Sequence, residues 1–137
     1  MTQRQKWIGV LMIVSACFLA FTLLAAEKAK EPTIKEFMRA KLNHSQKALE
    51  GLALGDFDMI SKNSQQMSLL TLAETWQVFQ TPDYIEQSKE FRRAVDSMTE
   101  AARKKNLDGA ALAYVQATTQ CIQCHKYVRG IRMASAR

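Results

Sequence analysis

Beyond residue 31, apolar residues recur at steps of three and four, which is the spacing of a buried helix face. In the first such segment Thr33 and Glu36 are spaced as a capping box, which predicts a helix start there. Gly55 and Asp56 supply the break that ends this helix. The positions on its predicted inner face are Ile34, Phe37, Met38, Leu42, Ser45, Leu49 and Leu52.

The same pattern predicts three more helices. The second follows the first break, and the third starts at Thr81-Pro82, a capping residue followed by proline at the first helical position. Residues 106–109 break the chain again, and a fourth helix runs to about Val128. Helices of similar length with short connections predict an all-α fold, an antiparallel up-down-up-down four-helix bundle over residues 32–132. Its core-forming positions are Ile60, Met67, Leu70, Trp76, Phe79, Phe91, Val95, Met98 and Ala102.

The first 26 residues are predicted to be a targeting segment. A short basic start precedes residues 7–26, which carry no charge and are long enough either for a cleaved signal peptide or for an uncleaved membrane anchor. Leu24 stands where a cleavage site favours a small residue, and Val14–Cys17 resembles a lipidation site that is followed by strongly apolar residues. All three interpretations place the domain in the periplasm, either soluble or tethered by residues 7–26.

Composition and charge narrow the class of protein. The 137 residues are 47% hydrophobic with two prolines and five glycines, which is typical of a helical globule rather than a disordered chain. The net charge of +6 is scattered, and the run Arg103–Lys105 complements a predicted helix end, so no nucleic-acid surface is expected. The sequence has no nucleophile paired with a base and no phosphate-binding loop, so no enzyme activity is predicted.

The sequence Cys121-Ile122-Gln123-Cys124-His125 has the C-x-x-C-H pattern of c-type haem attachment. On a helix the two cysteines and the histidine project from one face within about one turn. Each thiol can then join one vinyl group of the porphyrin, while the imidazole reaches the iron. We therefore expect one covalent haem c, held by Cys121 and Cys124, with His125 as an axial ligand of the iron.

Other uses of paired cysteines fit less well. A thioredoxin-type motif sits between a strand and a helix, and no strand is predicted. A structural zinc site needs more ligands than Cys17 and His44 supply. A disulfide between Cys121 and Cys124 would strain a helix, because their side chains lie one turn apart.

The tail from Leu112 to Arg129, with the haem motif near the end of the fourth helix and a basic residue four positions after His125, resembles the class II cytochromes c. These are cytochrome c′ and its low-spin relatives, and the resemblance covers residues 32–132. Val128 departs from the family, which usually has an aromatic residue there. The resemblance implies that the sixth position of the iron faces the first helix.

The residue at that sixth position separates two functions. The resemblance points to Met38, whose thioether would complete a six-coordinate electron carrier, and we favour this ligand over the alternative that Met38 is core filler. If Leu42 caps the iron instead, the site is five-coordinate and binds gases such as nitric oxide or carbon monoxide. His44 lies about 240° around the helix from Met38 and is expected to be solvated, and Lys41 is expected to point outward.

Two further expectations concern packing. The fourth helix is short of large side chains, which would leave room for the haem. The resemblance also implies a homodimer through the first two helices, with Leu54, Met59 or Leu69 in the contact, whereas the redox partner cannot be named from the sequence. The small residues of the fourth helix are Gly109, Ala110, Ala111, Ala113 and Ala117.

Overall fold

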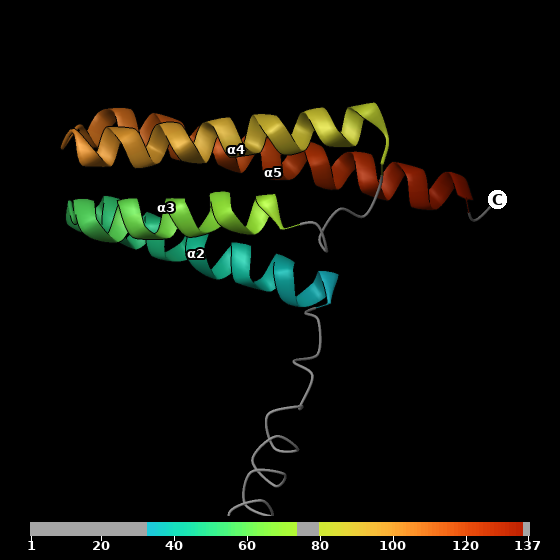
Figure 1. The fold of residues 1–137 in the computed structure, drawn as a ribbon, viewed down its shortest axis with the longest axis horizontal. Coiled ribbons are helices and arrows are strands. Elements are labelled where there is room, and N and C mark those ends of the chain that lie inside the picture. Colours follow the sequence, from blue (N-terminus) through green and yellow to red (C-terminus); the bar gives the residue numbers. More distant parts are fainter. Residues whose placement is uncertain (1–32, 74–79, 136–137) are drawn as a thin grey trace, which may run out of the picture. The chain divides into compact units, whose positions relative to one another are not determined.

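The computed structural model describes residues 33–73 and 80–135, and this part of the chain contains four helices and no strand. They are α2 (Ile34–Leu54), α3 (Phe57–Leu72), α4 (Pro82–Arg103) and α5 (Leu107–Ser135) (Figure 1). The predicted all-α class is confirmed.

The chain divides into two compact units, Met1–Glu31 and Pro32–Arg137. The four described helices all belong to the second unit. The predicted targeting segment lies outside the described residues, as do Trp76 and Phe79. Within the described part, no helix is both long enough and apolar enough to cross a membrane.

Local sequence signals set the ends of the helices. The backbone N–H of Thr33 donates to Glu36 Oε2 at 2.6 Å, and the Glu36 N–H donates to Thr33 Oγ1 at 3.3 Å, so the predicted capping box forms. These hydrogen bonds with Thr33 lower the pKa of Glu36 below its usual value. Gly55 ends α2 in the left-handed region, with φ of 69°, which glycine adopts without steric cost.

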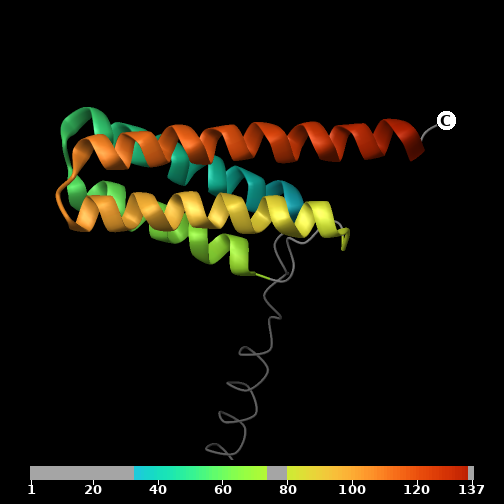
Figure 2. The ribbon, with the colours of Figure 1, turned by 90° about the horizontal axis from the view of Figure 1, so that it is seen from above.

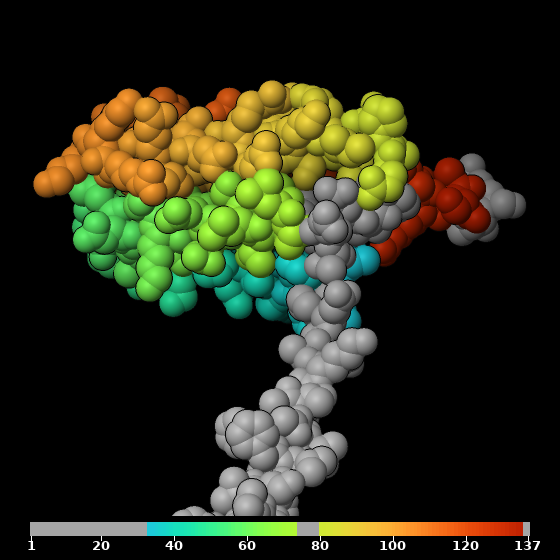
Figure 3. Space-filling view, in the orientation of Figure 1, coloured from blue at the N-terminus to red at the C-terminus, as the bar shows by residue number. Residues whose placement is uncertain are grey.

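Each helix packs against the next one in the sequence, whereas α2 and α5 touch over a much smaller stretch. In the space-filling view the side chains of α3 and α4 meet along their shared boundary (Figure 3). Figures 1 and 2 show the C-terminal end of α5 continuing past the ends of the other three helices. Helix α5 is longer than predicted, because it passes Val128 and Gly130 and ends at Ser135.

The main core contains buried residues from all four described helices, including Ala48 of α2. The alanines at 110, 113 and 117 are buried in the same cluster as Val95 and Met98 of α4, and side chains this small let two helices approach closely. Ser64 of α3 and Thr99 of α4 share a buried hydrogen bond of 2.7 Å across the core. The alanines therefore join α5 to α4.

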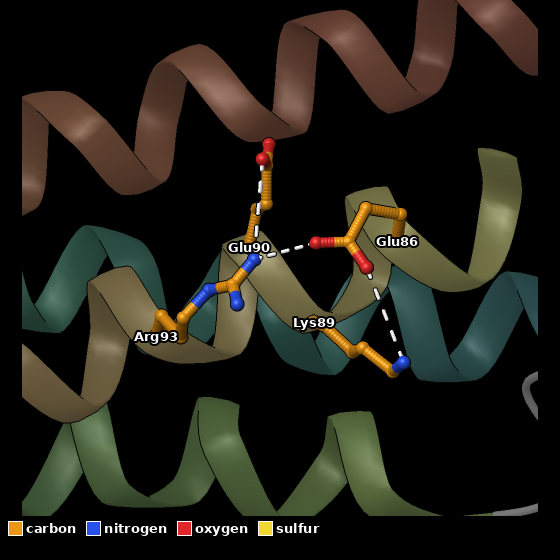
Figure 4. Close-up of polar contacts among 4 residues, drawn as sticks. All are labelled: Glu86, Lys89, Glu90 and Arg93. Atoms are coloured by element: carbon orange, nitrogen blue, oxygen red, sulfur yellow. Dashed lines mark hydrogen bonds and ion pairs between the residues drawn. The ribbon is translucent and has the colours of Figure 1, made fainter.

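The outer surface of α4 carries its own network of ion pairs (Figure 4). Arg93 lies 2.6 Å from Glu86 and 3.9 Å from Glu90, and Lys89 lies 4.0 Å from Glu86. All four side chains are more than 40% exposed, so each pair contributes at most about 1 kcal/mol. These pairs neutralise the charges of α4 locally.

Candidate functional site

A pocket of about 520 Å³ opens into the bundle, with walls contributed by all four helices. Its volume falls within the range of roughly 300–1,000 Å³ that is usual for small-molecule and cofactor sites. All four residues predicted to hold haem iron or the haem itself line this pocket: Met38, Cys121, Cys124 and His125. The structure therefore brings together residues that lie more than eighty positions apart in the sequence.

Helix α5 presents the cysteine–histidine motif on the pocket wall. Cys121 and His125 are exposed at the pocket, Cys124 is half-buried, and both cysteines are free thiols. Burial raises the pKa of each thiol above its usual value, and the positive charge of Lys41 opposes this effect. Both sulfur atoms are thus held mainly as neutral thiols.

Met38 reaches the pocket from the first turns of α2. It is half-buried beside the small cluster formed by Phe37 and Tyr84, and Cys124 packs on the same cluster. Leu42, one turn further along α2, lines the pocket as well and remains 47% exposed. Both candidates for the sixth position of the iron therefore lie at the site.

The prediction that Lys41 points outward is wrong. Its Nζ lies 4.2 Å from the centroid of the Phe91 ring of α4, inside the pocket. Burial lowers the pKa of Lys41 from 10.5 to about 8, and the nearby thiols of Cys121 and Cys124 oppose this shift. The flexible side chain of Lys41 lets its amine reach the face of the Phe91 ring on α4. A helical wheel of α2 alone does not predict this contact.

His44 does not line the pocket, as its angular offset from Met38 predicts. It is half-buried rather than solvated, because its Nδ1 lies 2.9 Å from Asn63 Oδ1 on α3. The amide of Asn63 donates to the Met59 carbonyl at 2.8 Å, which leaves Asn63 Oδ1 to accept, so His44 Nδ1 carries the proton. His44 thus links α2 to α3.

Sequence reasoning missed several contributors to the pocket, among them Met67, Gln87 and Gln120. Met67 of α3 was expected only in the core, and it is 2% exposed there while also lining the pocket. Gln87 and Gln120 each bury an Oε1 atom that has no hydrogen-bond partner in the described part of the chain, and both residues line the pocket. No sequence signal separates these residues from ordinary core or surface positions.

The small residues of α5 play a different part from the one predicted. None of Gly109, Ala110, Ala111, Ala113 or Ala117 is among the described residues that line the pocket. The space at the site comes instead from the limited contact between α2 and α5. The prediction that these small residues leave room for a haem is therefore wrong.

The pocket has an unbalanced charge. Three cations line it, Lys35, Arg39 and Lys41, whereas no Asp or Glu occurs among its described lining residues. Such a site favours a ligand that combines a large apolar body with negative charge. Within residues 33–73 and 80–135, the pocket included, no group of three or more His, Cys, Asp and Glu side chains is arranged to hold a metal ion.

Comparison with known proteins finds no match for this chain among family models, curated proteins or solved structures.

Proposed function

We propose that this protein is a c-type cytochrome that carries electrons, with one haem c attached through Cys121 and Cys124 and iron ligated by His125 and Met38. The observation that carries this proposal is the common pocket. Two thiols, an imidazole and a thioether converge on one cavity of about 520 Å³. Together these groups make up the attachment and ligand set of a six-coordinate haem c.

The residues present fit this cofactor. The two thiols are one helical turn apart on α5, as the two vinyl groups of one porphyrin edge require. Lys35 and Arg39 supply positive charge for two propionates, while Phe91 and Met67 supply apolar walls that exclude water. The bound haem iron supplies a one-electron oxidation and reduction, and the protein adjusts its potential through ligands, burial and nearby charge.

Fold and location complete the proposal. An up-down-up-down bundle is supported by the short connections Gly55–Asp56 and Lys104–Asn106 between long helices. This is the architecture that the resemblance to class II cytochromes c implies. A signal or anchor within residues 1–26 would place the domain in the periplasm. Its partners there are proteins rather than nucleic acids. Its role is electron transfer rather than catalysis.

The second candidate is a five-coordinate cytochrome c′ that binds nitric oxide or carbon monoxide. It is favoured by Leu42, which lines the pocket one turn beyond Met38 and could cap an iron that lacks a sixth ligand. A homodimer belongs to this same resemblance. Of the residues suggested for its contact, Leu54 and Leu69 are exposed, at 70% and 52%.

Absorption spectroscopy of protein matured in a host that attaches haem c tests the proposal. Six-coordinate low-spin spectra in both oxidation states, with the weak methionine-to-iron charge-transfer band in the ferric form, support Met38 as the ligand. A high-spin spectrum with ready binding of carbon monoxide by the reduced protein supports the second candidate. A pyridine haemochrome assay that detects no haem c overturns both, and leaves a helical bundle with a dithiol.

A further inference from the structure

The outer side of α5 concentrates positive charge near the haem motif. From Gly109 to Ser135 the helix contains no Asp or Glu, whereas Lys126, Arg129 and Arg132 are all exposed. None of these three cations forms an ion pair with another described residue. By contrast, four charged side chains of α4 pair with one another: Glu86, Lys89, Glu90 and Arg93 (Figure 4).

Exposed apolar side chains accompany these cations. Val115 and Ile122 are 63% and 53% exposed, and they lie two turns apart on the side of α5 that faces away from its buried alanines. The intervening hydroxyl of Thr119 donates to the Val115 carbonyl at 3.0 Å, and that of Thr118 donates to the Tyr114 carbonyl at 2.9 Å. Because these hydroxyls are already bonded, covering this surface with another protein costs little in lost hydration.

This surface adjoins the proposed haem site. Ile122 lies between the two cysteines of the motif, and Lys126 and Arg129 follow His125 by one and four positions. Thr118, which is exposed next to this surface, also lines the pocket. A protein bound over Ile122 would be separated from the pocket by little more than the α5 backbone.

We propose that Val115, Ile122, Lys126 and Arg129, here called the α5 docking surface, bind the acidic face of a redox partner protein. The inference rests on the proposed electron-transfer function and adds the charge and position of the partner site. Unpaired cations beside exposed apolar side chains match a partner that presents carboxylates beside exposed apolar side chains. They disfavour a second copy of this chain, because two such surfaces would bring like charges together.

Stopped-flow kinetics with a defined probe tests this proposal. The probe is a reduced plant-type [2Fe–2S] ferredoxin, an acidic protein with a potential of about −400 mV, which reduces the ferric cytochrome. The second-order rate constant should fall steeply as salt is added. In Lys126→Glu/Arg129→Glu the rate constant at low ionic strength should drop by about tenfold or more, and the salt dependence should flatten or reverse.

The matched control is Arg103→Glu/Lys105→Glu, which makes the same change in net charge. These residues lie before the start of α5, roughly 30 Å along the helix from Lys126 at 1.5 Å per residue. The control should retain most of the wild-type rate constant. Ile122→Ser should slow the ferredoxin reaction while leaving reduction by hexaammineruthenium(II), a small cation, unchanged.

Each other outcome has a definite meaning. Equal slowing in both charge variants overturns the docking surface and leaves the electron-carrier proposal intact, provided that every variant contains haem c. If sedimentation shows a dimer and Ile122→Ser dissociates it, the surface binds a second copy of this chain and the inference is overturned. If the protein binds phosphatidylglycerol vesicles, and Lys126→Glu/Arg129→Glu abolishes this binding but leaves the rate constant with ferredoxin unchanged, the surface binds a membrane and the inference is overturned. Protein without haem c removes the proposed function and this inference together.

Discussion

Replacing Met38 by Ala should cost far more stability in the haem-bound protein than in the haem-free protein. Full burial of a methionine makes its replacement by Ala cost about 2–5 kcal/mol. Met38 is only half-buried on the wall of an open pocket, so the haem-free protein should lose roughly 1 kcal/mol. When haem is present, loss of the iron–sulfur bond should add a coupling of about 2 kcal/mol or more.

Met67 supplies the matched control, because it is a second methionine that lines the same pocket. It is 2% exposed and belongs to the main core, so Met67→Ala should cost about 2–5 kcal/mol with or without haem. The two variants are compared by urea unfolding, followed by circular dichroism in the far ultraviolet, and by the visible spectrum of the ferric form. Only Met38→Ala should abolish the charge-transfer band.

Two results would refute this reasoning. If Met38→Ala costs the same in both forms and leaves the spectrum unchanged, Met38 is core filler and the five-coordinate alternative gains support. If Met67→Ala removes the charge-transfer band while Met38→Ala does not, the sixth ligand comes from α3.

Three further predictions concern the pocket. His125→Ala should retain some thioether attachment yet lose the bond from His125 to the iron. The thermal midpoint of the haem-bound protein should then fall and its spectrum should become high-spin. An unchanged spectrum would contradict His125 as a ligand. The second prediction concerns haem-free Cys121→Ala/Cys124→Ala protein, whose free energy of unfolding should increase from about pH 8 to 10.5. The reason is that Lys41 has a pKa of about 8 in the folded protein, so in this pH range its amine binds fewer protons than the same amine in the unfolded chain. Adding Lys41→Met should remove that increase in urea midpoints measured across this pH range, and persistence of the slope would assign it to another group. Gln120→Leu should stabilise the haem-free protein by about 1 kcal/mol, because it removes a buried oxygen that lacks a hydrogen-bond partner in the described chain. A lower urea midpoint would show that this oxygen already has a hydrogen-bond partner.

Signals carried by neighbouring residues were sufficient to predict the start and end of α2 and the start of α4. The capping box at Thr33, the left-handed Gly55 and the start at Thr81-Pro82 each act through the backbone within a few residues. The end of α5 was placed too early: α5 continues through Gly130, a residue type that often ends a helix, and its apolar residues lie on more than one side.

The wall of the pocket was less predictable, because it depends on how the helices approach one another. Helical angles put Met38 and Leu42 on a shared side of α2, and both residues line the pocket. The same angles failed for Lys41, whose long side chain reaches Phe91 of another helix. The prediction for the alanines of α5 rested on side-chain size and failed as well, since a small residue serves close helix packing as readily as it serves a cavity.

The most direct test of the central claim is the intact mass of the protein after maturation in a host that attaches haem c, measured under denaturing conditions. Our account predicts that the wild-type mass includes one haem, and that Cys121→Ala/Cys124→Ala protein from the same host has the mass of the polypeptide alone. A wild-type protein that is fully folded and exported, yet has the mass of the bare polypeptide, would contradict the account.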